Sequence, residues 1–488
     1  MPHAARAQTT ITTDRVLTFG SLNDQFAFPI LPYGGGSDVI FGGSYYGNFT
    51  LPRTGGGSFT LQHQGNGDVF FARMDIDTNA VDWVFTARGP QIQEAPELGA
   101  LPDGTILASL GVSGATTIGA ETTTPYSLSS VDGSFDPVLL AVEPGGLGFE
   151  WTEWISGPLT SLCREFAPGR GLDFFACVWG RGSLTFRTGQ PDQFTHPETN
   201  KFFDGTIAKY RGDGSLAWVT ANCGEREDFY SAVSRFADGH IVTVGKFSGT
   251  SKLACGRPSE ATLTGAGDFD ILTAEFDGDG ELVWALAHGG TLGDDAFHVE
   301  ALPSGDFLFA GNYSNGAGFQ MADGSTRVLN TVGSATDTFI AKARRGDGRL
   351  LWVSALNSEG ANYAQDLVYL PDAGLAATVS SFENTLSYLG FPFLESRGGS
   401  DMVVALFRVS DGGAIAAHQI GGTGNETASH LKLMNDGRLV LAGSFEGICI
   451  FGPPDATART SNGGADGFLM TMRVETDLAR RGEGLLVR

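Results

Sequence analysis

The chain has 488 residues, including 70 glycines and 35 phenylalanines, and its 31 basic and 55 acidic side chains give a formal net charge of −24 at pH 7. This excess of negative charge disfavours binding to nucleic-acid phosphates or to anionic lipid. No run comes near the roughly 18 consecutive apolar residues that a membrane-spanning segment needs. We therefore expect a soluble, monomeric protein with no nucleic-acid partner and no membrane span.

The amino terminus carries a trace of an export signal. Ala5-Arg6-Ala7 before Gln8 has the small-x-small form of a signal-peptidase site, although the apolar core that precedes such a site is absent from this chain. The five cysteines are an odd number, so they do not decide the compartment. Together with the family resemblance given below, the terminus predicts an extracellular, periplasmic or cell-surface location.

Three markers recur along the chain at an almost constant interval. Five tryptophans are separated by 68, 67, 66 and 68 residues: Trp83, Trp151, Trp218, Trp284 and Trp352. An aspartate opens a short apolar run in each of seven segments: Asp68, Asp136, Asp204, Asp270, Asp337, Asp401 and Asp466. Tight turns such as Leu101-Pro102-Asp103-Gly104 follow most of the tryptophans by 20 residues, and Ala416 stands where a sixth tryptophan is due. The period predicts seven copies of one unit.

Each copy has the pattern of four strands. In the fourth copy two tight hairpins, 229–247 and 270–288, are joined by one long connection, and no segment shows the 3.6-residue period of a helix. A four-stranded sheet cannot bury both of its faces alone, and packing such sheets radially around an axis solves this problem. The sequence therefore predicts an all-β, seven-bladed β-propeller with four antiparallel strands per blade.

Two stretches resemble known propeller families. The segment from Gly267 to Asp277, followed by Gly280-Glu281-Leu282-Val283-Trp284, resembles the bacterial β-propeller repeat of secreted and surface proteins, and the resemblance covers nearly the whole chain. The segment from Ala72 to Trp83 resembles the tryptophan-docking motif of quinoprotein propellers. The resemblance implies strands A to D from the axis outward, with the tryptophan on strand D. We expect each large ring to pack against the neighbouring blade, which is a structural role.

We expect a single domain over residues 1–488. Blades 1 to 7 are predicted at residues 24–88, 94–156, 160–222, 228–288, 295–356, 364–420 and 427–473, with a tail at 474–488. No tryptophan strand follows Asp466, so we expect residues 11–19 to pair with strand C of blade 7 and close the ring as its outer strand. Counting back from the first turn places Thr13 in the tryptophan slot, and Leu485-Leu486-Val487 competes for the same edge.

The long connections all fall on one face of the predicted wheel. The D-to-A and B-to-C loops lie there, and alternating residues such as Gly318-Phe319-Gln320-Met321 predict a small hairpin in each B-to-C loop. Such a crown of seven hairpins is either a binding surface on a rigid scaffold or a lengthening of the blades.

A ring of polar residues is expected at the mouth of the central channel, ten residues before each tight turn. It comprises Asn23, Gln93, Asp228, Asp294, Asn362 and Glu426, with Asp24, Glu94 and Asp295 beside them. Carboxylate and carbonyl oxygens are the ligands of calcium, which is therefore a candidate metal, whereas no cofactor is evident. The alternative is that these residues cap the turns that enter strand A.

Two cysteines are candidates for a disulfide. Cys223 and Cys255 both fall on the long-loop face, at the end of strand D of blade 3 and in the B-to-C loop of blade 4. Cys163 and Cys177 flank the first turn of blade 3 and are expected as thiols, and Cys449 is expected to be free.

No catalytic set is visible in the sequence. It has no nucleophile elbow, no zinc-site spacing and no phosphate-binding loop. We expect a noncatalytic secreted or cell-surface module that binds a protein or glycan ligand through its long-loop face, with Trp179, which lies outside the periodic register, as the best candidate for an exposed aromatic ring. The alternative is an enzyme, either a carbohydrate lyase or hydrolase with its acid and base across the channel mouth or a quinoprotein-like oxidoreductase.

Overall fold

The computed structural model describes residues 9–20, 25–130, 134–196, 202–333, 336–389, 391–452 and 458–476. Within these ranges the chain is almost entirely β-strand, and its helical content is one 3-10 turn, η1, at Pro371–Ala373. No helix in this part of the chain combines the length and the apolar character needed to cross a bilayer. The prediction of an all-β protein is confirmed for the described residues.

Seven four-stranded antiparallel units can be followed through the described residues. Units 1 to 3 are β2 (Gln25–Pro32), β3 (Asp38–Tyr45), β6 (Asp68–Asp75) and β7 (Ala80–Arg88); β8 (Gln93–Ala100), β9 (Ile106–Val112), β12 (Asp136–Val142) and β13 (Phe149–Trp154); and β14 (Ser161–Pro168), β15 (Phe174–Arg181), β18 (Phe203–Tyr210) and β19 (Leu216–Ala221). Units 4 to 6 are β21 (Asp228–Arg235), β22 (Ile241–Phe247), β25 (Asp270–Phe276) and β26 (Leu282–His288); β27 (Asp295–Ala301), β28 (Phe307–Tyr313), β31 (Asp337–Ala343) and β32 (Leu350–Ser358); and β33 (Asn362–Leu370), β34 (Leu375–Phe382), β37 (Asp401–Arg408) and β38 (Ala414–Gly422). Unit 7 is β39 (Glu426–Leu433), β40 (Leu439–Phe445), β43 (Asp466–Thr476) and β1 (Thr9–Phe19). We call the four strands of a unit A to D in this order.

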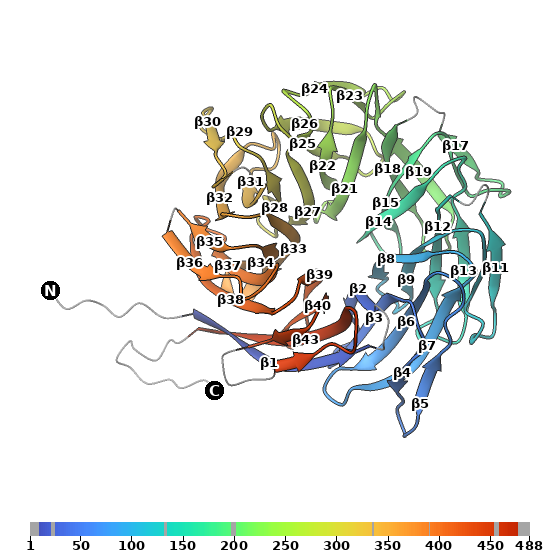
Figure 1. Cartoon of the computed structure of the whole chain (residues 1–488). Helices are drawn as coiled ribbons and strands as arrows, with labels where there is room; N and C mark the ends of the chain where they lie inside the picture. The colour runs from blue at the N-terminus through green and yellow to red at the C-terminus, as the bar shows by residue number, and fades with distance from the viewer. Residues whose placement is uncertain are drawn as a thin grey trace.

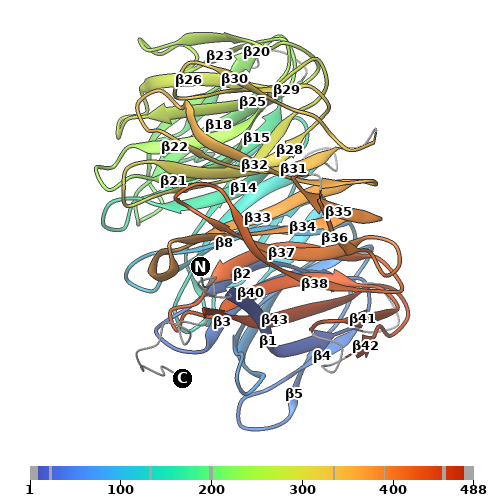
Figure 2. The same cartoon turned by 90° about the vertical axis from the view of Figure 1, so that its left-hand side faces the viewer.

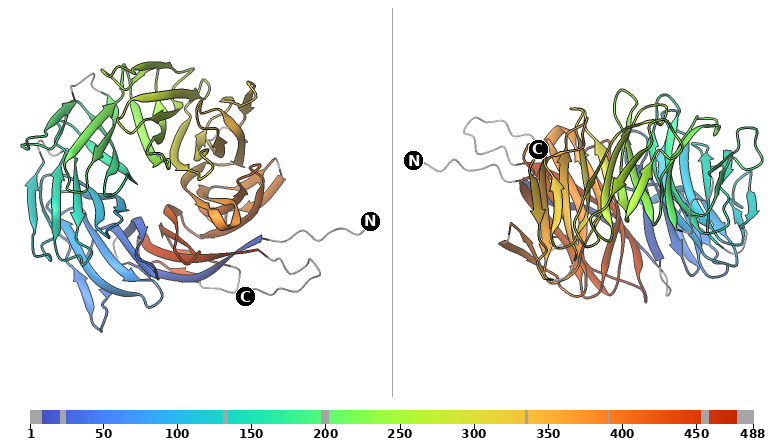
Figure 3. Two further views of the ribbon diagram at one scale, coloured as in Figure 1. Left: turned by 180° about the vertical axis from the view of Figure 1, so that it is seen from behind. Right: turned by 90° about the horizontal axis from the view of Figure 1, so that it is seen from above.

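The units stand around one axis in a propeller-like arrangement, with their A strands innermost (Figure 1). Each A strand contacts the A strands of both neighbouring units, and β39 contacts β2, so the cycle of contacts is complete. The same ring is seen from behind in Figure 3. The A strands therefore line the central space, which places their side chains in a common environment.

The hydrophobic core lies between the units. Every residue of β9, β12, β25 and β28 is buried, because neighbouring units cover both faces of each sheet. One core cluster, for example, joins Ile340 of unit 5 to Val403 of unit 6. Polar groups at the sheet ends form hydrogen bonds with adjacent loops. Asp270 accepts hydrogen bonds from the backbone N–H groups of Ala266 and Gly267, at 2.7 and 3.3 Å.

The outer strand of unit 7 comes from the amino terminus. Strand β1 pairs antiparallel with β43, from Thr9 opposite Thr476 to Phe19 opposite Gly467, and the two strands lie side by side in Figure 2. The predicted pairing of residues 11–19 with Asp466–Arg473 is confirmed, and β43 runs on to Thr476. The competing segment Leu485-Leu486-Val487 lies outside the described residues.

Each periodic tryptophan packs on the C-to-D turn of the following unit. Glycines with positive φ stand beneath the five rings, at Gly146, Gly214, Gly280, Gly348 and Gly412. A Cβ atom at Gly280 would lie 2.9 Å from the Trp218 ring, so the indole and the turn leave no room for a side chain. Trp218 Nε1 also donates a hydrogen bond to Gly278 O at 3.0 Å, and Trp151 does the same to Gly212 O at 2.9 Å. These contacts join neighbouring units at their outer edge.

The same geometry explains why two units lack the tryptophan. Unit 7 has no C-to-D turn, because its D strand comes from the other end of the chain, so Ala416 in unit 6 has no turn on which to pack. In β1 Arg15 pairs with Thr471, five residues after Asp466, just as Trp284 pairs with Glu275, five residues after Asp270. Arg15 therefore stands in the tryptophan slot, and the prediction of Thr13 was wrong. Arg15 Nη1 donates to Asp77 O, the carbonyl equivalent to Gly278 O. Two residues further on, Asn79 replaces the glycine and keeps its positive φ of 62°.

The predicted hairpins of the B-to-C loops are confirmed. They are β4 (Phe49–Pro52) with β5 (Ser58–Leu61), β10 (Ala115–Ile118) with β11 (Tyr126–Ser129), β16 (Leu184–Phe186) with β17 (Phe194–His196), β23 (Thr250–Leu253) with β24 (Ala261–Thr264), β29 (Ala317–Gln320) with β30 (Thr326–Leu329), β35 (Thr385–Tyr388) with β36 (Phe391–Glu395), and β41 (Ile448–Ile450) with β42 (Ala458–Thr460). Six of them bridge to the end of strand D in the preceding unit; β10 pairs with β7, for example, and β41 with β38. The hairpins therefore extend the sheets and connect adjacent units.

A disulfide fixes one of these connections. Cys223 lies on β20 (Cys223–Gly224), which pairs with hairpin strand β23, and it is bonded to Cys255 with a Cα–Cα distance of 5.9 Å. Cys163, Cys177 and Cys449 are buried free thiols.

Candidate functional site

The polar ring predicted at the channel mouth lies where the A strands begin. Among its described members, Gln93, Asp228, Asp294, Asn362 and Glu426 are all buried. Four of them hold loops: Asp294 accepts hydrogen bonds from the N–H groups of Gly290 and Ser314, both at 2.8 Å, and Glu426 accepts one from Gly422 at 3.0 Å. Asn362 donates to Leu356 O at 2.9 Å, and Gln93 donates to Ser113 O at 3.2 Å. The contacts of these four residues fit the capping alternative. Asn23 and Asp24 lie outside the described part of the chain.

Calcium binding at this ring stays a prediction. In the ranges that the structure describes, no three His, Cys, Asp or Glu side chains are grouped in the way that a metal site requires. Burial raises the pKa of Asp228 and of Glu426 to about 8 and that of Asp294 to about 6. These carboxyl groups thus hold protons more strongly than exposed ones.

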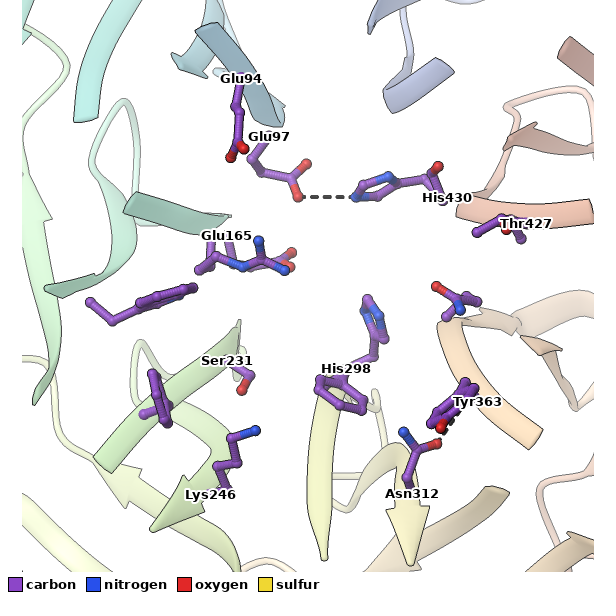
Figure 4. Close-up of a pocket in the computed structure, with 18 of the residues that line it drawn as sticks. Glu94, Glu97, Glu165, Ser231, Lys246, His298, Asn312, Tyr363, Thr427 and His430 are labelled. Atoms are coloured by element: carbon purple, nitrogen blue, oxygen red, sulfur yellow. Dashed lines mark hydrogen bonds and ion pairs between the residues drawn. The ribbon is translucent and has the colours of Figure 1, made fainter. Parts of the chain in front are cut away.

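A central cavity of about 790 Å³ opens among the A strands, on the side of the long loops (Figure 4). One member of the predicted ring, Glu94, lines the cavity. A second member, Asp295, binds the lining residue Lys246, with 2.6 Å between Oδ2 and Nζ. Its walls are rich in aromatic rings: Tyr46, Trp179, Phe229, Phe297 and Tyr363.

The aromatic residues form a connected wall on one side. The Trp179 ring lies edge-on to Phe229, with centroids 5.3 Å apart, and Tyr363 is 47% exposed across the cavity. Arg164 lies over Trp179 at 5.7 Å and Lys246 over Phe229 at 5.3 Å, each measured to the ring centroid. A cation beside each aromatic ring gives this wall both an apolar surface and positive charge.

Below this wall lies a belt of charged side chains that the sequence analysis missed. Each A strand contains a bulge, and the residue that follows the bulge is equivalent in units 2 to 7. These residues are Glu97, Glu165, Ala232, His298, Asp366 and His430. Lys432 and Glu300 follow two residues after a histidine, and we call the seven charged or titratable residues the belt.

The belt lies four residues further along strand A than the predicted ring. Five of the six residues that follow a bulge stand six residues before the turn residue used as the marker, so the spacing is visible in the sequence: Glu97, Ala232, His298, Asp366 and His430. The direction of these side chains cannot be read from the sequence, because a bulge changes which residues of a strand face the axis. The signal that could have revealed the belt is the residue type at one repeat position, which is Glu, Glu, Ala, His, Asp and His in units 2 to 7.

Two histidines of the belt are paired with carboxylates across units. His298 Nδ1 is 3.1 Å from Asp366 Oδ1, and His430 Nε2 is 3.2 Å from Glu97 Oε2. Asp366 also accepts hydrogen bonds from the N–H groups of Leu367 and Leu431, at 2.7 and 2.8 Å. Lys432 Nζ is 3.5 Å from Asp366 Oδ2. Both carboxylates are thereby almost completely buried yet well compensated.

The same environment separates the protonation of the belt carboxyl groups. Burial opposes ionisation of Asp366, but Lys432 and His298 outweigh it and lower its pKa below the usual value. Burial also opposes ionisation of Glu97, and His430 outweighs it in the same direction. For Glu165, burial and then the charge of Glu97 raise the pKa well above its ordinary value. Burial raises the pKa of Glu300 to about 7. The belt therefore combines carboxyl groups whose pKa is lowered with others whose pKa is raised, an arrangement typical of sites for acid–base chemistry.

A second cavity of about 600 Å³ lies on the other side of the belt, towards the A-to-B turns. Glu165 and His298 line both cavities, whereas Glu300, Asp366 and Lys432 line only this one. The belt thus separates the two halves of the central space.

Comparison with known proteins gives fold-level likeness alone. No family model and no curated protein sequence matches the chain. Among solved structures, a quinohemoprotein alcohol dehydrogenase from Comamonas testosteroni is similar at 10% identity and a TM-score of 0.37, over 96% of this chain and 78% of the other. One from Pseudomonas putida HK5 is similar at 8% identity and a TM-score of 0.39, over 99% and 78%. Hydrazine synthase from Kuenenia stuttgartiensis is similar at 12% identity and a TM-score of 0.36, over 72% and 76%.

Proposed function

We propose that this protein is a secreted or cell-surface seven-bladed β-propeller, closed by its amino-terminal strand, that binds a carboxylate-bearing glycan in the central cavity on its long-loop side. The observation that carries the proposal is the aromatic wall of Trp179 and Phe229 with Arg164 and Lys246 beside it. Aromatic faces suit the apolar faces of sugar rings, and guanidinium and ammonium groups suit sugar carboxylates.

The size and shape of the cavity support a ligand of oligosaccharide length. A volume of about 790 Å³ lies within the range of ordinary ligand sites. The exposed ring of Tyr363 faces the cavity from unit 6, opposite the wall formed by units 3 and 4. A sugar chain could therefore contact aromatic surface on both sides.

The local charge supports an anionic ligand in spite of the net charge of −24. Burial raises the pKa of Glu94 and of Glu165, so these two lining groups repel an anion less than their number implies. Arg164 is exposed within the cavity, where its guanidinium can meet a ligand. Physiological salt screens the distant surface charge, so the nearby groups determine the electrostatic potential in the cavity.

The Cys223–Cys255 disulfide supports an oxidising compartment, in which such bonds persist. We propose an extracellular, periplasmic or surface location and a monomeric state, which light scattering after size-exclusion chromatography would test.

The direct test is a thermal-shift and calorimetric panel with oligogalacturonate, a neutral maltooligosaccharide and a cationic chitosan oligomer. Oligogalacturonate alone is expected to stabilise the protein, by about 2.7 kcal/mol at a hundredfold excess over its Kd. Trp179→Ala should abolish most of this shift, whereas Phe393→Ala, at a 40% exposed ring on a hairpin away from the cavity lining, should not. A panel in which the neutral sugar binds as tightly as the uronate contradicts the proposed ligand class.

One observation favours the second candidate function, a carbohydrate-cleaving enzyme. The two histidine–carboxylate pairs lie in the same central space as the proposed glycan site, where a noncatalytic binding protein has no need of them.

A further inference from the structure

The two sides of the cavity floor carry complementary groups. His298 enters from unit 5 and Glu165 from unit 3, and Figure 4 shows both side chains reaching towards the centre of the cavity. We propose that the protein cleaves the acidic glycan that it binds by β-elimination, with His298 as the base and Glu165 as the acid. This inference rests on the proposed function.

His298 is held in the orientation of a base. Its Nδ1 faces Asp366 Oδ1 at 3.1 Å, and because an ionised carboxylate only accepts hydrogen bonds, the ring proton is on Nδ1 and the lone pair is on Nε2. Asp366 is kept in place by two backbone N–H groups and by Lys432, so it acts as a positioning residue. Burial lowers the pKa of His298, which leaves the imidazole neutral and able to take a proton at neutral pH.

Glu165 has the complementary character of an acid. It follows the bulge of β14 in the position that His298 occupies in β27. Burial and the neighbouring charge of Glu97 raise the pKa of its carboxyl group well above the ordinary value, which favours the protonated form. It can then donate that proton to a leaving oxygen and regain one from solvent.

The belt favours elimination over hydrolysis. Glycoside hydrolysis uses an ionised carboxylate as nucleophile or as the base for water. The two belt carboxylates with lowered pKa, Glu97 and Asp366, are at most 2% exposed and are bound to histidines, so their oxygens are already engaged. Elimination requires only a neutral base, an acid and positive charge near the sugar carboxylate, which Arg164 supplies.

The step balances without a further reactant. His298 Nε2 takes the proton from the carbon that bears the carboxylate, and the electron pair of that C5–H bond forms the C4–C5 double bond. The C4–O bond breaks, and Glu165 donates its proton to the departing oxygen. The products are an unsaturated uronide and a shortened chain with a free hydroxyl group. His298 then loses its proton to solvent and Glu165 is reprotonated.

The experiment measures binding and turnover separately on the full chain with oligogalacturonate. Product is followed by the ultraviolet absorbance of the new conjugated double bond, and affinity by calorimetry. The variants are Glu165→Gln and His298→Gln, with Phe393→Ala, at a residue that lines neither cavity, as the control. Glu165→Gln and His298→Gln should each lose about 10²- to 10⁴-fold in turnover while binding within about threefold of the wild type. Phe393→Ala should retain both properties.

The two proposals can fail independently. Wild-type protein that binds oligogalacturonate but forms no unsaturated product overturns the elimination and leaves the glycan site standing, whereas absence of binding overturns the proposed function. Reducing ends that appear without unsaturation also overturn the elimination, as does full turnover by either variant. If a variant melts below the wild type, Asp366→Asn provides a second measure. Because Asp366 positions His298, this variant should show a lower kcat with an unchanged KM and an altered pH profile.

Discussion

The packing of each tryptophan on a glycine of the next unit makes a quantitative prediction for Gly280→Ala. Gly280 has a φ of 82°, and a Cβ there would meet three carbons of the Trp218 ring at 2.9, 3.0 and 3.1 Å. The left-handed conformation costs an L-residue roughly 1 to 2 kcal/mol. Displacing a packed ring adds about 1 to 3 kcal/mol. Gly280→Ala should therefore lower the free energy of unfolding by about 2 to 5 kcal/mol.

Gly437 offers a matched control for the backbone part of this cost. Its φ is 83°, and nothing lies within 4 Å of the position that a Cβ would occupy. Gly437→Ala should thus show the backbone strain alone, about 1 to 2 kcal/mol. In a Trp218→Ala background, Gly280→Ala should fall to the same value, which gives a coupling energy of about 1 to 3 kcal/mol between the two positions.

The assay is urea denaturation followed by far-ultraviolet circular dichroism, because this signal does not depend on the tryptophan that is removed. Equal costs for Gly280→Ala and Gly437→Ala, or an unchanged cost of Gly280→Ala without the indole, would refute the reasoning that the ring requires a glycine beneath it.

Three further predictions concern the ends, the buried acids and the disulfide. Deleting residues 1–20 removes β1, exposes the edge of β43, and should lower the melting temperature sharply and promote aggregation; a truncated protein that melts with the intact one contradicts this role. Burial raises the pKa of Asp228 and Glu426 to about 8, so their protonated forms are favoured by folding, and the stability that they contribute is full below about pH 4 and lost as the pH rises to 8. Melting temperatures measured from pH 5 to 9 should therefore decline, whereas a rise over this window would show that these two groups are ionised in the folded protein. Reducing the Cys223–Cys255 bond, which closes a loop with a sequence separation of 32, should cost roughly 3 to 4 kcal/mol of unfolding free energy, and an unchanged denaturation midpoint in reductant would show that the hairpin contact holds without it.

The architecture was readable from the sequence because its markers are structural. The aspartates and tryptophans recur since each performs the same task in successive units: Asp270 binds the N–H groups of its loop, and Trp218 packs on the next turn. The pairing of the two chain ends followed from a missing strand in the last repeat. These features depend on spacing alone.

The site was not readable in the same way. A ring was expected at the start of strand A, where Asp294 and Glu426 instead hold loops. The charged belt lies four residues later, after a bulge that no residue type in the sequence predicts. A bulge adds a residue to one strand and reverses the alternation of its side chains, so counting from the turn identifies the position but not the face.

The repeated bulge also bears on how this scaffold can acquire new chemistry. Six units present one side chain each at an equivalent place on the channel wall, and five of these side chains are titratable, while the sixth is Ala232. The side chain at such a place is independent of the turns, the aspartates and the indoles that hold the units together. A single substitution of Ala232, which lines the second cavity with Glu165 and His298, would therefore place a sixth titratable side chain at this level of the central space. Specificity in such a ring can therefore change at one unit while the other units keep their residues.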